Sequence, residues 1–216
     1  MSRLSYGVSM SLDGFVAGDN QGPDNPLGVG GELLHAWMRE LEVWRAQAGQ
    51  TGGGSNASTK VLKEEGENIG AIVMGRNMFG GGPGPWSSEQ PWRGWWGENP
   101  PFHRPVYVLT HYEREPLAMD GGTTFTFVTG GIHAALDLAR EAAGGQDVAL
   151  FGGGSTAGEY LAAGLVDEVS IHLVPVILGA GVRLFDNPDL ASTLRLEQVS
   201  AMEAPGVAHL KYRVTR

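Results

Sequence analysis

The stretch DVALFGGGSTAGEYLAAGLVDEVSIHLVPVILGAGVRLF, residues 147–185, decides the fold of this chain. It predicts a buried strand over 148–151, a glycine turn, a helix that opens at Ser155 and a second apolar strand over 169–176. Glycines let a ligand approach the backbone closely, and a hydroxyl side chain can cap the helix that follows. The turn consists of Gly152, Gly153 and Gly154, and the candidate caps are Ser155 and Thr156.

The start of that helix predicts an anion site. Free amides and the helix dipole favour negative charge there, most often a phosphate. A nucleotide-like ligand is therefore the first hypothesis. The alternative is a glycine turn that joins a strand to a helix and binds nothing.

Composition indicates one globular domain over residues 1–216, with 42% hydrophobic residues. The formal net charge of −9 argues against nucleic acid as a partner, but a local patch can still bind an anionic ligand. Cysteine is absent, which excludes disulfides, thiol catalysis and cysteine–metal sites, and we expect no metal. The N-terminal MSRLSYGVSMSLDGF lacks the apolar core of a signal peptide, and no run approaches membrane-spanning length. We therefore expect a cytoplasmic protein without membrane contact.

Strand and helix signals alternate along the chain. Strands are expected over 4–10, 14–17, 71–74, 105–110, 125–128, 148–151, 169–176, 194–202 and 207–214. Helices are expected over 32–47, 58–68, 132–143 and from Ser155, while 50–56 reads as a surface linker and the tryptophan-rich 80–101 as irregular. This order predicts a three-layer α/β fold, with a mostly parallel central sheet, an antiparallel C-terminal edge and helices on both faces.

Polar residues follow three of the expected strands, where open α/β sheets bind ligands. IVMGRNMF (72–79) places Gly75, Arg76 and Asn77 after a strand, and a planar arginine suits a phosphate, although it can equally be solvated. VYVLTHY (106–112) places Thr110 and His111 at the next strand end, where the histidine could bind phosphate or ribose or lie on the surface. Asp13 lies in the turn of SMSLDGFVAG (9–18), a position that favours aspartate for local hydrogen bonding alone.

Together, SLDGFVAG, MGRNMF, VYVLTH and FGGGSTAGEYLAAGLVDE with PVILGAG resemble the dihydrofolate-reductase-like fold. Within it they resemble the reductase domain, the RibD C-terminal domain, of the bifunctional deaminase-reductase of riboflavin biosynthesis. The order and spacing match over nearly the whole chain, and stand-alone bacterial members also carry the WRGWWG insert. Nothing in the sequence resembles the HxE and PCxxC zinc ligands of the deaminase.

The resemblance implies hydride transfer from NADPH to a small heterocyclic substrate, and pairing of two chains as a homodimer through the C-terminal part of the sheet. It implies that Gly75, Arg76, Asn77, Thr110 and His111 flank the adenosine phosphate, that Gly152 to Thr156 take the pyrophosphate, and that Ala17 and Gly18 lie by the nicotinamide. For the accompanying proton, the candidates are Asp13, Glu32 and His35. For Glu32, favourable charge at a helix N-terminus is the alternative explanation.

Other functions remain open at this point. The substrate could be that of the riboflavin pathway, a dihydrofolate or pteridine, or another small molecule. Gly152-x-Gly154-x-x-Ala157 also fits a Rossmann fingerprint. Gly153-x-Ser155-x-Ala157 approximates a hydrolase elbow, for which Asp186 and His209 follow in the right order. A catalytically silent nucleotide-binding module is the last alternative. Residues 18–31 and the tryptophan-rich insert are expected to shape the substrate pocket, although the tryptophans could instead form a satellite core or a dimer face.

Overall fold

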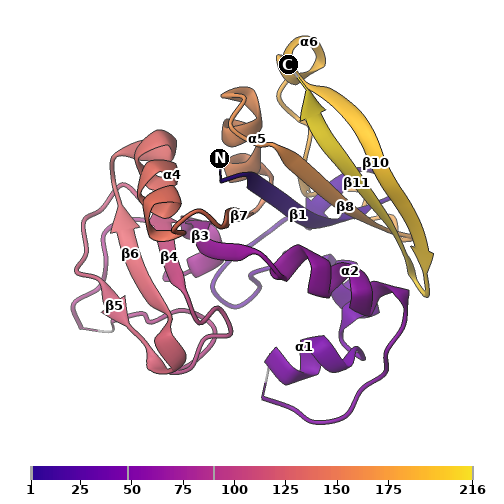
Figure 1. Cartoon of the computed structure of the whole chain (residues 1–216). Helices are drawn as coiled ribbons and strands as arrows, with labels where there is room; N and C mark the ends of the chain where they lie inside the picture. Colours follow the sequence, from indigo (N-terminus) through magenta and orange to yellow (C-terminus); the bar gives the residue numbers. More distant parts are fainter. Residues whose placement is uncertain (1, 48, 90, 216) are drawn as a thin grey trace.

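The central element of this computed structural model, which describes residues 2–47, 49–89 and 91–215, is a nine-stranded sheet of order β10-β11-β8-β1-β7-β3-β4-β6-β5. Figure 1 shows β10 and β11 (yellow) at one edge of the sheet and β5 and β6 (pink) at the other. The strands are β1 Leu4–Ser11, β3 Ile69–Gly75, β4 Pro105–Leu109, β5 Leu117–Ala118, β6 Thr124–Val128, β7 Asp147–Phe151, β8 Glu168–Val174, β10 Arg195–Ala204 and β11 Val207–Thr215.

Strand direction follows the expected pattern. β8, β1, β7, β3, β4 and β6 are parallel, while β11 and β10 add an antiparallel C-terminal edge and β5 an antiparallel strand at the other edge. The predicted α/β fold with a mostly parallel sheet is therefore confirmed. Because parallel strands share their carboxyl ends, the segments that follow them gather at one edge of the sheet.

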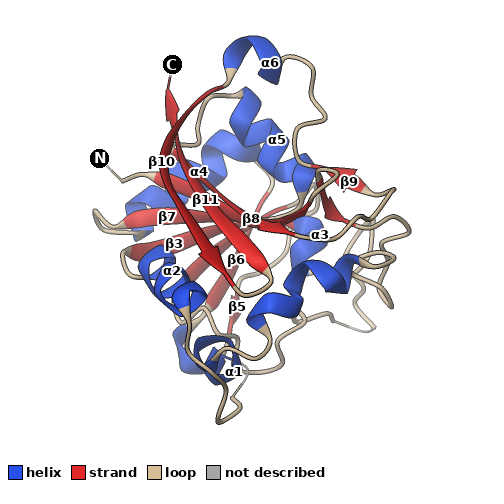
Figure 2. Ribbon diagram, turned by 90° about the vertical axis from the view of Figure 1, so that its right-hand side faces the viewer, coloured by secondary structure: helices blue, strands red, loops and turns tan. Residues whose placement is uncertain are grey.

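Helices cover both faces of the sheet (Figure 2). The strands alternate their side chains, so Ala71 and Val73 of β3 pack with α4 Gly131–Ala142 and α5 Gly154–Ala162, while Ile72 and Met74 pack on the opposite face. That opposite face holds α3 Arg76–Phe79 and, farther along the sheet, the 3-10 helix η1 Gly31–Met38 and the helix α2 Ala57–Gly66. The remaining helices are α1 Glu42–Gln47, η2 Asp120–Gly122 and α6 Leu190–Thr193.

The tryptophan-rich segment forms part of the core. Its described residues contain no helix or strand, as expected, and Trp86, Trp92 and Trp96 pack on the aromatic cluster around Phe79 and Phe125. The Nε1 of Trp92 donates to the carbonyl of Phe79 at 2.8 Å, which pins the segment to α3. Of the roles considered for these tryptophans, the satellite core is the one the contacts support.

The long helix expected over 32–47 is wrong. The segment divides into η1 and α1, because the backbone of 40–42 pairs with Gly54 instead of continuing the helix: Glu42 N donates to Gly54 O at 2.9 Å and Gly54 N donates to Glu40 O at 2.8 Å. Trp44 of α1 is consequently 39% exposed.

A second difference concerns the strand over 14–17. β2 Phe15–Ala17 pairs antiparallel with β9 Val182–Arg183, a short strand that the sequence does not reveal, and these two form a separate sheet. The apolar strand expected over 169–176 is β8, and it lies inside the sheet between β1 and β11. The edge strand of the C-terminal part of the sheet, through which the resemblance implies a homodimer, is instead β10.

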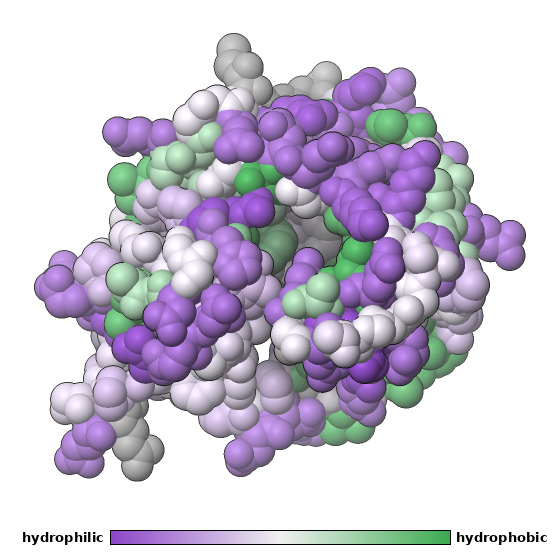
Figure 3. All heavy atoms as spheres, turned by 60° about the horizontal axis from the view of Figure 1, so that its bottom comes forward, coloured by the Kyte–Doolittle hydropathy of each residue, from purple (hydrophilic) through white to green (hydrophobic). Residues whose placement is uncertain are grey.

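The molecular surface combines hydrophilic and hydrophobic side chains. On the face that Figure 3 shows, most side chains are hydrophilic, and hydrophobic surface lies inside a central hollow. Among the described residues, no helix is both long and apolar enough to cross a membrane.

Candidate functional site at the carboxyl edge of the sheet

The glycine turn after β7 leaves the start of α5 open. The helix begins at Gly154 with Gly153 as its N-cap, and no side chain caps it, so the expected caps at Ser155 and Thr156 are wrong. A glycine at the cap position brings no side-chain acceptor, so the first amides of α5 have no cap. Tyr6 of β1 donates its hydroxyl to Gly152 O at 3.2 Å and fixes the turn from behind.

Gly153 faces open space. Its φ of −77° and ψ of −178° suit any residue, and a Cβ built there meets no heavy atom within 4 Å. The backbone of the turn can therefore be approached from this side, as an anion held by amides requires.

Gly75 and the glycine turn are neighbours through Thr156. A Cβ on Gly75 would lie 2.5 Å from Thr156 Oγ1, and one on Gly152 would lie 3.2 Å from Thr156 Cβ. The end of β3 and the start of α5 are thus in contact, and two segments singled out in the sequence meet.

The short β2–β9 sheet extends this surface from the glycine turn to Ala17 and Gly18. A Cβ on Gly154 would overlap the carbonyl of Arg183, and Ala17 of β2 pairs with Val182 of β9. Gly181, next to β9, packs so closely that a Cβ there would overlap Ala17 O.

Gly18 in turn lies against the start of η1. A Cβ on Gly31 would lie 3.3 Å from Gly18 N, and Glu32 follows directly. A continuous track therefore runs from Gly75 and Arg76 over the glycine turn and β9 to Ala17, Gly18 and Glu32; we call it the carboxyl-edge track.

Arg76 lies at one end of this track and is held by the tryptophan-rich segment. Its guanidinium donates to Gly80 O at 2.8 Å and Gly82 O at 2.9 Å, and it lies over the Trp86 ring at 3.2 Å from the centroid. Burial and then the charge of Arg114 lower its pKa to about 10. Two of five N–H donors are used in these bonds, so others remain for an anion.

Arg114, which the sequence analysis did not single out, lies on the same aromatic group. Its guanidinium is 4.7 Å from the Trp86 centroid and 4.9 Å from that of Phe127. Within the described part of the chain, its Nη1 is buried without a hydrogen-bond partner. Burial, followed by the charge of Arg93, lowers its pKa. Two guanidinium groups thus lie close together, and both have donors left for an anion.

The other residues that were predicted to lie near the phosphates differ in burial. Thr110 is buried and its hydroxyl accepts from Tyr112 N at 3.2 Å, so it shapes the turn after β4. His111 and Asn77 are exposed beside it and at the start of α3. Ser155 is exposed in the first turn of α5.

Asp13 is an anchor for the loop after β8. Its carboxylate accepts from Ser11 Oγ at 2.6 Å, Leu178 N at 3.2 Å and Gly179 N at 2.7 Å. The hydrogen bond from Ser11, together with the two amides, lowers its pKa to about 2, although desolvation opposes this. Arg183 also binds the Asp13 carbonyl, at 2.9 Å. A carboxyl group in this state is ionised at neutral pH and has no proton to donate.

Glu32 and His35 both lie on η1, but in different environments. Glu32 is exposed, while His35 is half-buried with Nδ1 3.4 Å from Gly31 O. Burial lowers the pKa of His35, so its imidazole is neutral at pH 7. Leu178, whose amide binds Asp13, would lie 3.4 Å from a Cβ on Gly30, so the Asp13 turn and the start of η1 meet across it.

The hydrolase interpretation lacks its histidine. His209 lies on β11 and binds Ser58 and His172, and no hydrogen bond between described residues joins Ser155 to a histidine. The Rossmann interpretation lacks its topology, since the parallel strands, renumbered along the chain, run 6-1-5-2-3-4 rather than 3-2-1-4-5-6.

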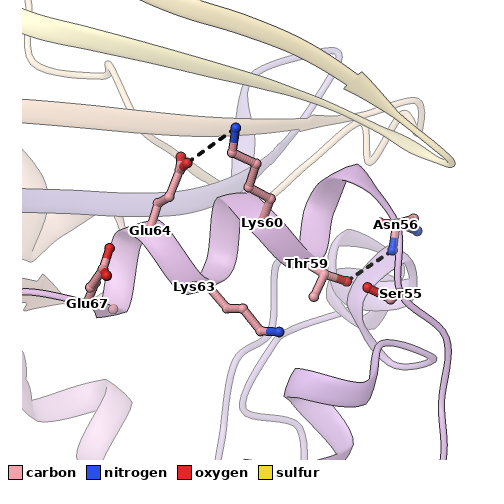
Figure 4. Close-up of a pocket in the computed structure, with 8 residues that line it drawn as sticks. Ser55, Asn56, Thr59, Lys60, Lys63, Glu64 and Glu67 are labelled. Carbon is pink, nitrogen blue, oxygen red and sulfur yellow. Dashed lines mark hydrogen bonds and ion pairs between the residues drawn. The ribbon is translucent and has the colours of Figure 1, made fainter.

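A surface pocket of about 540 Å³ lies elsewhere. It follows the outer side of α2, and Figure 4 shows Lys60 paired with Glu64, at 3.6 Å, among other charged side chains. Its lysines and glutamates balance one another, and none of its lining residues belongs to the carboxyl-edge track.

Comparisons with known proteins agree with this fold. A family model described as the RibD C-terminal domain matches residues 4–209. A candidate riboflavin biosynthesis protein of Shewanella sp. PV-4 is similar in structure, with a TM-score of 0.59, 20% identity and 100% of both chains covered. No curated protein matches the sequence at a significant level.

Two longer proteins share the fold over part of their length. RibD of Acinetobacter baumannii has a TM-score of 0.59 and 15% identity over 100% of this chain and 59% of its own. The diaminohydroxyphosphoribosylaminopyrimidine deaminase/5-amino-6-(5-phosphoribosylamino)uracil reductase of Thermotoga maritima has a TM-score of 0.57 and 13% identity over 99% of this chain and 57% of its own. This chain therefore spans less than two thirds of either protein.

Proposed function

This chain belongs to the RibD C-terminal domain family, and from that premise we propose that it is a single-domain reductase over residues 1–216 that uses NADPH to reduce a small nitrogen heterocycle or a group attached to one. The family membership agrees with the resemblance drawn from the sequence motifs. The finer assignments below are our own proposal.

The carboxyl-edge track is the observation that carries the proposal. It joins, in order, an arginine, an uncapped helix N-terminus with a glycine turn, and the backbone of Ala17 and Gly18 beside Glu32. A dinucleotide carries the same sequence of chemistry: a phosphorylated ribose, a pyrophosphate and a nicotinamide next to the substrate. We propose that the cofactor lies along the track in that order.

The residues at the arginine end suit a ribose phosphate. Arg76 has spare N–H donors, and the buried Nη1 of Arg114 has no partner among the described residues. A buried donor without a partner is costly, and an anion would satisfy it. We propose that both arginines hold the 2′-phosphate, with Asn77, Thr110 and His111 around the adenosine, which would favour NADPH over NADH.

The glycine turn suits the pyrophosphate. Gly153 faces open space and offers close approach, while Gly152 and Gly154 on either side of it pack against Thr156 and Arg183. The uncapped amides up to Ser155 and Thr156 are donors in a favourable dipole. Ala17 and Gly18 would lie by the nicotinamide. When bound, NADPH supplies a hydride, and the protein must supply a route for one proton.

For the proton, we propose Glu32 and His35 as the residues that orient or protonate the substrate. Glu32 lies next to Gly31, which contacts Gly18, and its side chain is exposed to incoming ligands. His35, neutral at pH 7, carries its hydrogen on Nδ1 toward Gly31 O and can accept a hydrogen bond at Nε2, which suits it to orient the substrate. We propose that Asp13, which is ionised, positions the loop at 178–179 and acts on turnover through it.

The substrate class follows from the family. The Thermotoga protein is named for reduction of 5-amino-6-(5-phosphoribosylamino)uracil, and we propose a related uracil or its ribosyl group as the first substrate to test. A dihydrofolate, a pteridine or another small molecule is the alternative. A homodimer through β10, an edge strand with Leu196 38% and Val199 46% exposed, is also proposed.

The decisive experiment has two parts. Titration with NADPH and NADH tests the cofactor, and the loss of NADPH absorbance with a panel of aminouracil ribosyl phosphates and pteridines tests the reaction. We expect NADPH to bind more tightly than NADH and at least one panel member to be reduced. NADPH binding without turnover would point to a binding module. Equal affinity for both cofactors would contradict the arginine assignment.

A further inference from the structure

A chain of buried polar side chains lies behind η1 and takes no part in the proposed reaction. Ser58 and Glu65 come from α2, His172 from β8 and His209 from β11. Ser58 Oγ is 2.8 Å from His209 Nε2, the two Nδ1 atoms of His209 and His172 are 2.8 Å apart, and His172 Nε2 is 3.4 Å from Glu65 Oε2. Ser58, His172 and His209 are 0%, 5% and 4% exposed. We call these four residues the histidine chain.

The histidine chain is neither a metal site nor a nucleophilic one. Among the described residues no group of three or more potential ligands could hold a metal, and the two Nδ1 atoms bind each other. Ser58 is fully buried, so no substrate can reach its hydroxyl.

The contact between the two Nδ1 atoms limits the number of protons. At 2.8 Å, one Nδ1 must carry the hydrogen and the other must accept it. With both rings neutral, His172 donates from Nε2 to Glu65 and accepts at Nδ1 from His209, whose Nε2 accepts from Ser58. One further proton fits, because His172 can then donate from both nitrogens while His209 Nε2 donates to Ser58 Oγ. A second further proton would place hydrogens on both Nδ1 atoms and turn the bond into a repulsion.

Burial is the main reason that the low-proton states are favoured at neutral pH. Burial and then the charge of His172 lower the pKa of His209 to about 4, although Glu65 opposes this. Burial would raise the pKa of Glu65, but the hydrogen bond and charge of His172 outweigh it, and the pKa is lowered. Glu64 of α2 and Lys211 of β11 border the same small cavity, of about 60 Å³, and Lys211 is paired with Glu168 at 2.9 Å. His35 of η1 also lies close to the histidine chain, since burial and, in smaller part, the charge of His172 lower its pKa.

Trp37 connects the histidine chain to η1. Its ring centroid is 5.2 Å from that of His172 and 5.0 Å from that of His209, and its Nε1 donates to Ser9 Oγ of β1 at 3.2 Å. Leu34 and Met38 of η1 pack in the same cluster, with Val174 and Val207. A change in the protonation or position of the two imidazoles therefore acts, through the contacts of Trp37, on the helix that carries Glu32 and His35.

We propose that the histidine chain is a positioning device for η1 that tolerates one added proton and is broken by the second. While the hydrogen bond between the two Nδ1 atoms is present, Trp37 stays packed against the histidine chain that α2, β8 and β11 carry, and this packing holds η1 in place. The second proton separates the imidazoles and loosens η1, so that Glu32 and His35 lose their positions beside Gly18. The link to turnover rests on the proposed reductase function, but the proton limit does not.

The test is the environment of Trp37 as a function of pH. In protein labelled with fluorotryptophan, the ¹⁹F resonance of Trp37 is assigned by its loss in Trp37→Phe. We expect this resonance to shift with a midpoint near the His209 pKa of about 4, before the other tryptophans move. In His209→Asn, an N–H donor remains at the Nδ1 position but cannot gain a proton, so the transition should disappear while the spectrum at pH 7 stays native. His133→Asn, at an exposed histidine on α4, should leave the transition unchanged.

Two further readouts keep the outcome decisive. Imidazole ¹⁵N spectra of the wild-type protein should show one hydrogen shared between the Nδ1 atoms at pH 7, whether or not the variant folds. If reductase activity is found, the acid limb of kcat should move in His209→Asn with kcat at pH 7 little changed. An unchanged Trp37 transition in His209→Asn, or two fully protonated rings beside a native Trp37 resonance, would overturn the proposal. A lack of reductase activity with the expected spectra would instead contradict only the proposed function.

Discussion

Substituting Gly153 by valine should separate cofactor binding from folding. Gly153 is exposed, its φ of −77° and ψ of −178° are allowed for valine, and its Cβ would meet no heavy atom within 4 Å. The fold should therefore lose nothing. Replacing glycine restricts the unfolded chain, which at compatible sites raises the free energy of unfolding by about 0.4–1 kcal/mol.

The same side chain should block the pyrophosphate. It would occupy the open space in front of the α5 amides, and losing two amide bonds to a charged group costs about 1.5–3 kcal/mol each. The sum, about 3–6 kcal/mol, corresponds to a loss of NADPH affinity of about 10²- to 10⁴-fold. Calorimetric titration measures the affinity, and thermal unfolding measures the stability.

Two other glycine substitutions in the same helix serve as controls for Gly153→Val. Gly158→Ala lies farther along α5 with no heavy atom near its Cβ, and it should raise stability by about 0.5–1 kcal/mol without changing NADPH affinity. Gly154→Ala would overlap Arg183 O and should lower both stability and affinity. If Gly153→Val binds NADPH as tightly as the wild type, the turn is structural and the pyrophosphate lies elsewhere.

Four further results are expected. Arg76→Ala and Arg114→Ala should each weaken NADPH binding about 10- to 100-fold, because each removes a charged donor to the 2′-phosphate. Parallel titrations should show a far smaller loss for NADH, and equal losses for both cofactors would contradict the assignment. Glu32→Gln should lower kcat by roughly 10²-fold with the Kd for NADPH little changed, and full turnover would mean that the proton comes from water. Burial lowers the pKa of His209 to about 4, whereas the imidazole of the unfolded chain titrates near about 6.5. Between these pH values the unfolded state binds more protons, so the free energy of unfolding should fall as the pH decreases from about 6.5 to about 4. Denaturant titrations should show that His209→Asn flattens this pH dependence. Light scattering should give a dimer, whereas a mass near 22.9 kDa at micromolar concentration would refute the homodimer.

The part of the carboxyl-edge track that joins Gly75 to the glycine turn was predictable because it depends on local order. Parallel strands joined by helices place all their following loops at one edge, so IVMGRNMF and FGGGST had to come together once each was read as a strand end. The strands that lead there, β3 and β7, are short buried apolar runs followed by glycine, and their length and flanking residues favour a strand over a helix.

The features that the sequence did not reveal depend on contacts between distant segments. η1 and α1 are separated by the pairing of 40–42 with Gly54, and β9 is a two-residue strand that exists through its pairing with β2. His172 and His209 each read as an ordinary strand residue, and they meet because the antiparallel register of β8 and β11 sets them opposite each other. Arg114 lies in a segment without periodicity, and its role depends on the ring of Trp86.

In the sequence, the glycine triplet at 152–154 was compatible with a reductase, a Rossmann site and a hydrolase. The residues that surround the triplet in the structure favour one of these three interpretations. A hydrolase needs a histidine at Ser155, but His209 is committed to Ser58 and His172. A Rossmann site needs its turn after the first strand of a differently ordered sheet. The observed neighbours are Thr156 beside Gly75 on one side and Arg183 beside Gly154 on the other. These contacts extend the turn into a track with arginines at one end and Glu32 at the other, and this arrangement supports the proposal of a reductase that binds a phosphorylated dinucleotide.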